Sequence, residues 1–297
     1  MALNEIVAND ICCGCGTCAG ICPNNAVKMK VSEGLFIPEV DETKCSKCGL
    51  CVKTCPGNTI DYGLLQKQVF SQDPEDPAIG NALFCYIGFA TDNQIRYSST
   101  SGGIITQLLI FALESKVIDG AIVTRMREDN PLVPEAFIAR TREEIIEAAN
   151  SKYCPVATNV CLPQVLKEEG RYAIVGLPCH LKGIRKAEAQ FPLLKKRIVM
   201  HLGLLCSHTV DFAGIHFLMK KIGVKNSEVR KIAYRGNGWP GSLSIETKSG
   251  ARISRPLVGS WHAYWPLFSS FFFTPMRCTM CPDQAAELAD LSFCYAW

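Results

Sequence analysis

Cysteine is the residue type whose abundance and spacing most strongly indicate chemistry in this chain. Seventeen of the 297 residues are cysteines. In a secreted chain such a content would indicate disulfides, but most of these thiols fall at the spacings of metal ligands. The pattern therefore predicts a metal-containing redox protein of the reducing cytoplasm.

Two runs near the N-terminus repeat one ligand pattern, C-x2-C-x2-C-x3-C-P. Each position of the second run lies 33 residues after its counterpart, and Asn58 and Ile60 follow Asn25 and Val27 at the same distance. The first run is Cys12, Cys15, Cys18, Cys22 and Pro23, and the second is Cys45, Cys48, Cys51, Cys55 and Pro56. This pattern is typical of bacterial two-cluster ferredoxins, in which the fourth cysteine of each run binds the other cluster.

The crossing of ligands assigns eight thiols to two 4Fe–4S clusters. Cluster one is predicted on Cys12, Cys15, Cys18 and Cys55, and cluster two on Cys45, Cys48, Cys51 and Cys22. Glycines 14, 16 and 49 would let the loops turn tightly and aim N–H groups at sulfur. Zinc is the alternative, but it takes one closed tetrahedron of ligands, so two complete runs favour iron–sulfur clusters. Cys13 lies outside the pattern and is expected to be a small packed or exposed residue.

The elements that must position these thiols divide the chain into four parts. We predict a ferredoxin domain over residues 1–66, a linker over 67–83 with two Asp-Pro steps, an α/β region over 84–175 and a C-terminal region over 176–297. The patterns predict helices over 104–113, 141–150 and 182–188, buried strands over 121–124, 172–177 and 198–205, and short strands over 228–234, 242–247 and 252–254. The fold class expected is α+β, with the ferredoxin domain followed by an α/β domain.

A third set of thiols lies at the ends of two predicted strands and in a separate C-x2-C pair. Cys179 and Cys206 each follow a buried strand, and Cys278 and Cys281 form the pair. Because ligands usually bind at the carboxyl edge of an open α/β sheet, these thiols could meet at a third 4Fe–4S cluster. A zinc site, a redox pair or an accidental spacing are the alternatives. Four thiols fit no pattern and are expected to be free core residues: Cys85, Cys154, Cys161 and Cys294.

Composition narrows the classes of partner. The net charge is only +3, which indicates neither nucleic acid nor an anionic membrane as a partner. No apolar run reaches the length of a membrane helix, and no N-terminal stretch has the pattern of a signal peptide. A cytoplasmic protein, at most peripheral to a membrane, is therefore expected.

Several motifs beyond the ferredoxin runs resemble the beta subunits of coenzyme F420-reducing hydrogenase. They are SSTSGGIITQLLIFALE at 98–114, SKY at 151–153 with Asn159, GLPCHLKGIRK at 176–186, GLLC at 203–206, YRGNGWPG at 234–241 and RCTMCPDQAAELADLS at 277–292. With a ferredoxin segment in front, the chain resembles the electron-input subunit of archaeal F420H2 dehydrogenase, a participant in methanogenesis.

This resemblance implies an iron–sulfur flavoprotein. Such proteins bind FAD, exchange a hydride with coenzyme F420 as substrate, and pass electrons through the clusters to other subunits of a hydrogenase, dehydrogenase or membrane-bound oxidoreductase. A flavin suits this task because it handles both hydride and single electrons. The resemblance also implies that Cys179, Cys206, Cys278 and Cys281 bind a cluster, and it implies no catalytic side chain. The cofactor-binding residues expected are Ser101, Gly102, Gly103, Lys152, Tyr153, Asn159, Pro178, Arg235, Gly238 and Trp239.

Plainer interpretations of these residues stay open. The Gly102-Gly103 pair could bind an FAD phosphate at a helix start or simply allow a tight helix entry. Lys152 could be solvated, the segment around Arg235 could be a surface turn, and His180 is expected to be polar rather than a ligand.

Two departures from the resembling family bear on function. The chain has Cys294-Tyr295 where the family has Gly-Asp, at a position that lies near the flavin site in the family. It also stops at Trp297 where relatives continue, so a truncated C-terminal region is expected. Both features favour an alternative, a multi-cluster electron-relay subunit without catalysis. A second alternative is a flavin and iron–sulfur reductase of another substrate.

Overall fold

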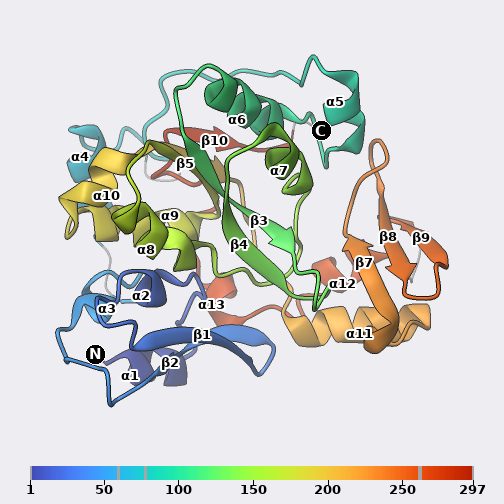
Figure 1. The fold of residues 1–297 in the computed structure, drawn as a ribbon, viewed down its shortest axis with the longest axis horizontal. Coiled ribbons are helices and arrows are strands. Elements are labelled where there is room, and N and C mark those ends of the chain that lie inside the picture. The colour runs from blue at the N-terminus through green and yellow to red at the C-terminus, as the bar shows by residue number, and fades with distance from the viewer. Residues whose placement is uncertain (1, 59–60, 77–78, 260–262, 296–297) are drawn as a thin grey trace.

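The computed structural model describes residues 2–58, 61–76, 79–259 and 263–295. The predicted equivalence of Ile60 with Val27 falls outside the described residues. Figure 1 shows an N-terminal part in blue below a larger mixed layer of helices and strands, with a smaller sheet at one side. The expected mixed helix and sheet fold is therefore confirmed.

The N-terminal part contains short elements besides the cysteine loops. Helix α1 (Leu3–Ala8) precedes the first run, and strands β1 (Val27–Ser32) and β2 (Leu35–Val40) form an antiparallel hairpin between the runs. Helices α2 (Thr17–Gly20) and α3 (Leu50–Lys53) begin inside the two runs. Each follows a glycine with positive φ, Gly16 at 83° and Gly49 at 74°, so both runs use the same tight turn.

Helix α4 (Tyr62–Phe70) corrects the predicted linker, since it extends into residues 67–70. The Asp61 side chain accepts a hydrogen bond from the backbone N–H of Leu64 and caps the helix. The helix ends at Ser71, whose φ is 61°, before the first Asp-Pro step. The Asp-Pro steps of the predicted linker therefore lie beyond the end of the helix.

The larger layer is built on a five-stranded sheet of order β10-β6-β5-β3-β4. The strands are β3 (Gly120–Met126), β4 (Pro134–Ala139), β5 (Tyr172–Gly176), β6 (Ile198–Leu204) and β10 (Leu291–Phe293). Only β4 runs antiparallel to its neighbour; the other pairs are parallel. The carboxyl ends of β5, β6 and β10 therefore point to one edge, which is the arrangement expected for the third set of thiols.

Helices cover both faces of this sheet. Successive residues of β3 alternate between two cores, with Ala121 and Val123 in one and Ile122 in the other. The first core includes residues of α5 (Asn93–Ser98), α6 (Ile104–Glu114) and α7 (Arg142–Glu147). The second includes residues of the 3-10 turn Thr158–Cys161, α8 (Leu162–Lys167), α9 (Pro178–Glu188) and α10 (Pro192–Arg197).

A smaller antiparallel sheet of order β7-β8-β9 follows, with β7 (Val229–Ala233), β8 (Ser242–Thr247) and β9 (Arg252–Pro256). It shares a core with α11 (Phe212–Ile222) and α12 (Tyr264–Ser269). A 3-10 turn (Asn226–Glu228) precedes β7, and α13 (Met276–Thr279) carries the first cysteine of the C-x2-C pair. The predicted hairpin at Ser249-Gly250 is confirmed.

The predicted helix and strand positions hold, with two differences at helix ends. Helix α7 has the predicted capping box at Thr141 and Glu144 but ends at Glu147, not Asn150. The chain turns away there because Asn150 has a φ of 73° and the Lys152 ammonium binds the carbonyls of residues 148, 149 and 150. Helix α9 begins at Pro178, four residues before the predicted start, because proline suits a first helical position.

Within the described residues, no helix combines the length and the apolar character needed to cross a bilayer.

Candidate redox centre and coenzyme site

The first predicted cluster site gathers thiols from both cysteine runs. Burial raises the pKa of Cys18 well above its ordinary value, and the neighbouring thiols of Cys12 and Cys55 add to the rise. Cys15 has Cys55 and Cys18 among its neighbours in the same way. The last cysteine of the second run therefore lies with the first three of the first run, as the crossed assignment requires.

The second predicted site has the complementary composition. Burial raises the pKa of Cys51, and the thiols of Cys48 and Cys22 add to the rise. Cys22 belongs to the first run, so the exchange of fourth cysteines is reciprocal. Cys45 lies in the loop before α3 with Cys48.

Backbone donors point at several of these sulfurs. The N–H groups of Gly14, Ala26 and Gly57 lie 3.5, 3.3 and 3.3 Å from the sulfurs of Cys12, Cys22 and Cys55. Such donors suit thiolate sulfur bound to iron, and the cysteine-only donor set fits a 4Fe–4S cluster. Among the residues that the structure describes, no three His, Cys, Asp or Glu side chains converge within reach of a single metal ion.

The structure brings three of the third set of thiols together at the carboxyl edge of the sheet. Burial raises the pKa of Cys206 to about 12, and the nearby thiols of Cys278 and Cys281 add to the rise. The backbone of Cys206 is fixed by a hydrogen bond from its N–H to the carbonyl of Gln284, at 2.9 Å. Cysteines from the end of β6 and from the C-x2-C pair are therefore neighbours, although about 70 residues separate them in sequence.

Cys179 lies on the ferredoxin side of this set. Its thiol hydrogen-bonds to Cys13, and this bond together with burial raises the pKa of Cys179. The same bond lowers the pKa of Cys13 to about 6 against the effect of burial, and Arg277 and Lys182 add to the fall. Cys13 therefore connects the first ferredoxin loop with Cys179, a contact that the spacing of the runs did not indicate.

Arg277 lies among the same thiols. Its guanidinium has Cys12 and Cys13 of the ferredoxin loop and Cys179 and Cys278 of the third set as neighbours. A positive charge at this point stabilises thiolate on both sides. The residue precedes Cys278, but nothing in its sequence context indicated that it would face the ferredoxin loop.

The predicted coenzyme residues meet where three loops converge. The N–H of Ser151 donates to Thr100 Oγ1 at 2.9 Å, and the N–H of Gly238 donates to the carbonyl of Tyr97 at 2.9 Å. Arg235 Nη1 lies 3.5 Å from Tyr153 Oη. Three loops therefore form one site. The first carries Ser101, the second Lys152 and Tyr153, and the third Arg235, Gly238 and Trp239.

Two cations lie on the loops that form this site. Arg235 is 1% exposed, and its Nε donates to the carbonyl of Pro240 at 2.7 Å. Lys152 is half-buried, donates to three carbonyls, and has its pKa lowered by burial to about 7. Lys152 is therefore not the solvated side chain that its sequence context allowed.

Two stacked tyrosines lie in this site, Tyr153 and Tyr264. The Tyr264 ring stacks on Tyr153 with 5.0 Å between ring centres, and its hydroxyl donates to the Tyr153 carbonyl at 3.0 Å. The pKa of Tyr264 is raised by burial, with Cys206 among the neighbours that add to the rise. Tyr264 therefore stacks on Tyr153 and has Cys206 among its neighbours.

Asn159 and Pro178, by contrast, lie at the contact between the ferredoxin part and the larger layer. Asn159 is fully buried, and its amide donates to Thr17 Oγ1 at 2.8 Å and to the His180 carbonyl at 2.9 Å. Pro178 starts α9, which packs on α2. His180 is buried, and burial lowers its pKa to about 4, in keeping with the polar role expected for it.

The Gly102-Gly103 pair has a local reason to be glycine. Gly103 has a φ of 75° at the start of α6, and a Cβ on Gly102 would lie 3.1 Å from the carbonyl oxygen of Gly88. A tight helix entry thus accounts for both residues, whether or not an anion binds there.

The unpatterned thiols divide into two groups. Cys154 and Cys161 are buried as expected, but Cys85 and Cys294 are exposed, which corrects the prediction for them. Cys85 lies in an extended surface segment, and Cys294 follows the edge strand β10, so neither faces a core.

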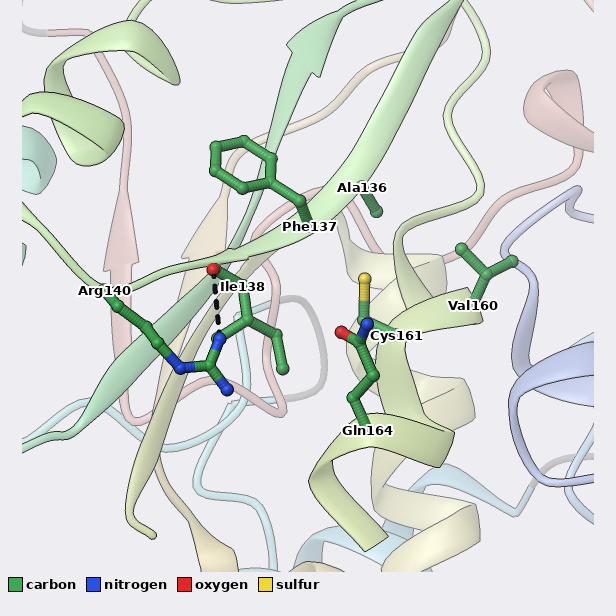
Figure 2. Close-up of a pocket in the computed structure, with 7 residues that line it drawn as sticks. All are labelled: Ala136, Phe137, Ile138, Arg140, Val160, Cys161 and Gln164. Carbon is green, nitrogen blue, oxygen red and sulfur yellow. Dashed lines mark hydrogen bonds between the residues drawn. The ribbon is translucent and has the colours of Figure 1, made fainter. Parts of the chain in front are cut away.

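A cavity of about 320 Å³ lies apart from these sites, between β4 and α8 (Figure 2). Seven residues line it: Ala136, Phe137, Ile138, Arg140, Val160, Cys161 and Gln164. None of them is a predicted site residue. Burial raises the pKa of the one thiol in this lining, Cys161, to about 12, so that thiol is unreactive at neutral pH.

Tyr295 lies in the candidate coenzyme site, where the resemblance placed positions 294–295, although it was not among the predicted cofactor-binding residues. Its hydroxyl lies 3.0 Å from Tyr153 Oη, and its ring lies 4.9 Å from the Arg235 guanidinium carbon. The departure from the family pattern at 294–295 was the signal for it. The pairing of β10 with β6 is what brings Tyr295 into the site.

The fold and the thiol sets together define an iron–sulfur protein in which a ferredoxin-type domain packs on an α/β layer. Comparison with known proteins identifies its family. Residues 85–162 and 169–296 match the models of the N- and C-terminal parts of the coenzyme F420 hydrogenase/dehydrogenase beta subunit, and residues 11–59 match the 4Fe-4S dicluster domain. The chain belongs to the family of coenzyme F420 hydrogenase/dehydrogenase beta subunits, which confirms the resemblance seen in the sequence.

Individual relatives support this assignment. The coenzyme F420 hydrogenase subunit beta of Methanococcus voltae is 32% identical over 72% of this chain and 72% of its own length. A component of the F(420)H(2) dehydrogenase of Methanosarcina mazei is 23% identical over 97% of this chain and 76% of its own length. In a solved structure of the F420-reducing NiFe hydrogenase complex from Methanosarcina barkeri, one chain is similar in fold. Its TM-score is 0.54 and its identity 24%, over 73% of this chain and 72% of that one.

Proposed function

We propose that this protein transfers electrons between coenzyme F420 and a partner redox protein, with FAD and three 4Fe–4S clusters as its cofactors. When bound, a flavin exchanges hydride with the deazaflavin and single electrons with iron–sulfur clusters. The chain's own residues hold these groups: the loops around Lys152, Tyr153 and Arg235 for the coenzymes, and the three sets of thiols for the clusters.

One observation carries this proposal, the continuity of the thiol sets with the coenzyme site. The ferredoxin loop meets Cys179 through Cys13, and Arg277 borders both sets. Tyr264 stacks on Tyr153 and has Cys206 among its neighbours. Such a series of neighbouring groups supports electron transfer between the coenzyme site and the thiol sets.

The relatives support the choice of substrate and partner. Their names associate them with coenzyme F420 as hydrogenase or dehydrogenase subunits. We therefore propose coenzyme F420 as the substrate and the other subunits of a cytoplasmic redox complex, soluble or peripheral to a membrane, as partners.

A second candidate function is an electron-relay subunit without a working flavin site. The contact of Tyr295 with Arg235 and Tyr153 favours it, because this ring occupies part of the site that the coenzyme would use.

Anaerobic purification distinguishes the two. The first function predicts about twelve iron atoms per chain, four for each cluster, together with bound FAD that reduced F420 bleaches and NADH does not. About eight iron atoms and no flavin would contradict it, and twelve without flavin would support the relay.

A further inference from the structure

Arg235 is a buried cation that lacks a counter-charge among the described residues. Its side chain is 1% exposed, and it forms no ion pair with any described carboxylate. Within the part of the chain that the structure describes, its Nη2 has no hydrogen-bond partner, Nε donates to the Pro240 carbonyl, and Nη1 has the Tyr153 hydroxyl at 3.5 Å. Buried guanidinium groups normally have an anion beside them, because an unpaired charge is costly to remove from water.

Tyr295 covers this guanidinium without satisfying it. The ring lies 4.9 Å from the guanidinium carbon, which gives a cation–π contact, and the hydroxyl lies 3.0 Å from Tyr153 Oη. A phenol ring is neutral and offers Nη2 no lone pair in this contact. Tyr295 therefore shields Arg235 from water as a weak partner that a stronger one can replace.

The surroundings suit an oxyanion of a larger ligand. Lys152, next to Tyr153 in sequence, directs its ammonium at the carbonyls of residues 148, 149 and 150, so Arg235 is the cation left to bind an anion here. The aromatic rings of Tyr97 and Trp239 are exposed. They lie on neighbouring loops, because a Cβ added to Gly238, the residue before Trp239, would lie 3.3 Å from the Tyr97 ring. The site thus combines a buried guanidinium with flat apolar surfaces at its rim.

We propose that Arg235 binds a phosphate group of the coenzyme, and that Tyr295 is a displaceable cover competing with it. This rests on the proposed function, whose coenzyme site it deepens. A guanidinium presents parallel N–H groups that match phosphate, so a phosphate oxygen takes the donor on Nη2 that is now unpaired. The ring of Tyr295 then moves away from Arg235, and its hydroxyl leaves Tyr153.

Calorimetric titration of the full, cluster-reconstituted chain with inorganic pyrophosphate tests the proposal. Tyr295→Ala should bind pyrophosphate at least about tenfold more tightly than the unaltered protein, because the competing ring is gone. Arg235→Gln and the double variant should lose this binding. Cys294→Ala, an exposed neighbour, is the matched control and should leave the affinity unchanged.

Equal pyrophosphate affinity in the unaltered, Tyr295→Ala and Arg235→Gln proteins would overturn the proposal. If Arg235→Gln fails to fold, as a fall in iron content and unfolding temperature would show, Tyr295→Ala decides alone, and no gain in affinity then contradicts the proposal.

FAD, riboflavin and oxidised F420 identify the source of the phosphate. An Arg235-dependent affinity for FAD but not for phosphate-free riboflavin assigns it to the flavin; the same dependence for F420 assigns it to the deazaflavin. Pyrophosphate binding requires no electron transfer. The phosphate site can therefore be confirmed even if reduced F420 fails to bleach the flavin, and bleaching by F420 can be observed even if pyrophosphate does not bind.

Discussion

At the scale of single residues, the thiols differ in which groups surround them. Cys179 lies against Cys13 and Arg277, whereas Cys161 is buried beside a cavity whose lining contains no other thiol. Replacing a cluster ligand removes the cluster from the protein, whereas replacing an isolated core thiol removes only packing contacts. The two residues thus form a matched pair for testing the third set.

We expect Cys179→Ala to lower the iron content by about four atoms per chain, the content of one cluster, and Cys161→Ala to leave it unchanged. Iron analysis of both proteins, purified without oxygen, measures this. Equal iron in the two variants would show that Cys179 holds no cluster.

A second residue-scale test concerns His201, which is buried between Glu188 and Asp290. Its Nε2 lies 2.6 Å from Glu188 Oε1 and its Nδ1 lies 2.9 Å from Asp290 Oδ2. Burial acts to lower the pKa of His201, but the hydrogen bonds to Asp290 and Glu188 outweigh it and raise the pKa above the ordinary value. The protonated imidazole therefore stabilises the folded state.

This stabilisation is complete below the unfolded pKa of about 6.5 and is lost as the pH rises through the higher folded pKa. The unfolding temperature should fall as the pH rises from the unfolded to the folded pKa of His201, and His201→Gln should make this fall smaller. His216→Gln, which alters an exposed histidine, should leave the fall in unfolding temperature unchanged. An identical pH profile for the His201→Gln and unaltered proteins would refute the assignment.

At the scale of elements, the ferredoxin part is held by close backbone approach. A Cβ on Gly20, in α2, would lie 2.0 Å from the carbonyl oxygen of Asn159, and the N–H of Asn159 donates to the Cys15 carbonyl at 3.0 Å. Lys186 of α9 reaches the Cys55 carbonyl at 2.7 Å. Helix α2 and the turn at Asn159 therefore leave no room for a side chain between them.

Gly20→Ala should destabilise the protein by about 1–3 kcal/mol, because the added methyl must displace backbone. In Gly63→Ala the new Cβ, in α4, would meet only the Asp61 side chain among the described residues, at 3.6 Å, so the change should stabilise the protein by about 0.5–1 kcal/mol. Urea unfolding followed by circular dichroism measures both. A neutral Gly20→Ala would mean that the two parts are not packed as closely as described.

The same scale shows what sequence could predict. Runs such as Cys12–Cys22 carry their ligand pattern locally, and α6 and β5 carry their own periodicity, so these were predicted. The contacts of Cys13 with Cys179, and of Tyr295 with Arg235, depend on long-range packing and on the three-residue strand β10. No local pattern specifies such pairings, and Asn159 accordingly lies at a contact between parts instead of the coenzyme site.

At the scale of the whole molecule, the ferredoxin part contacts the third set of thiols through Cys13 and Cys179, and its hairpin contacts α11 through Phe36 and Phe212. Figure 1 shows the blue N-terminal part next to α13 and α9, with the smaller sheet, which Arg235 follows in sequence after β7, farther along the molecule. On the proposed function, electrons that enter at Arg235 and Tyr153 leave through the ferredoxin part, and the partner subunit binds there.

The most direct measurement of this account is the redox state of the ferredoxin clusters after reduced F420 is added. The protein is mixed with reduced F420 without oxygen, frozen, and measured by electron paramagnetic resonance, with the flavin absorbance recorded in parallel. We predict that the flavin is bleached and that signals of reduced 4Fe–4S clusters appear, and that Cys179→Ala keeps the first change but loses most of the second. Full reduction of the ferredoxin clusters in Cys179→Ala, or no cluster reduction in the unaltered protein, would contradict the proposed path.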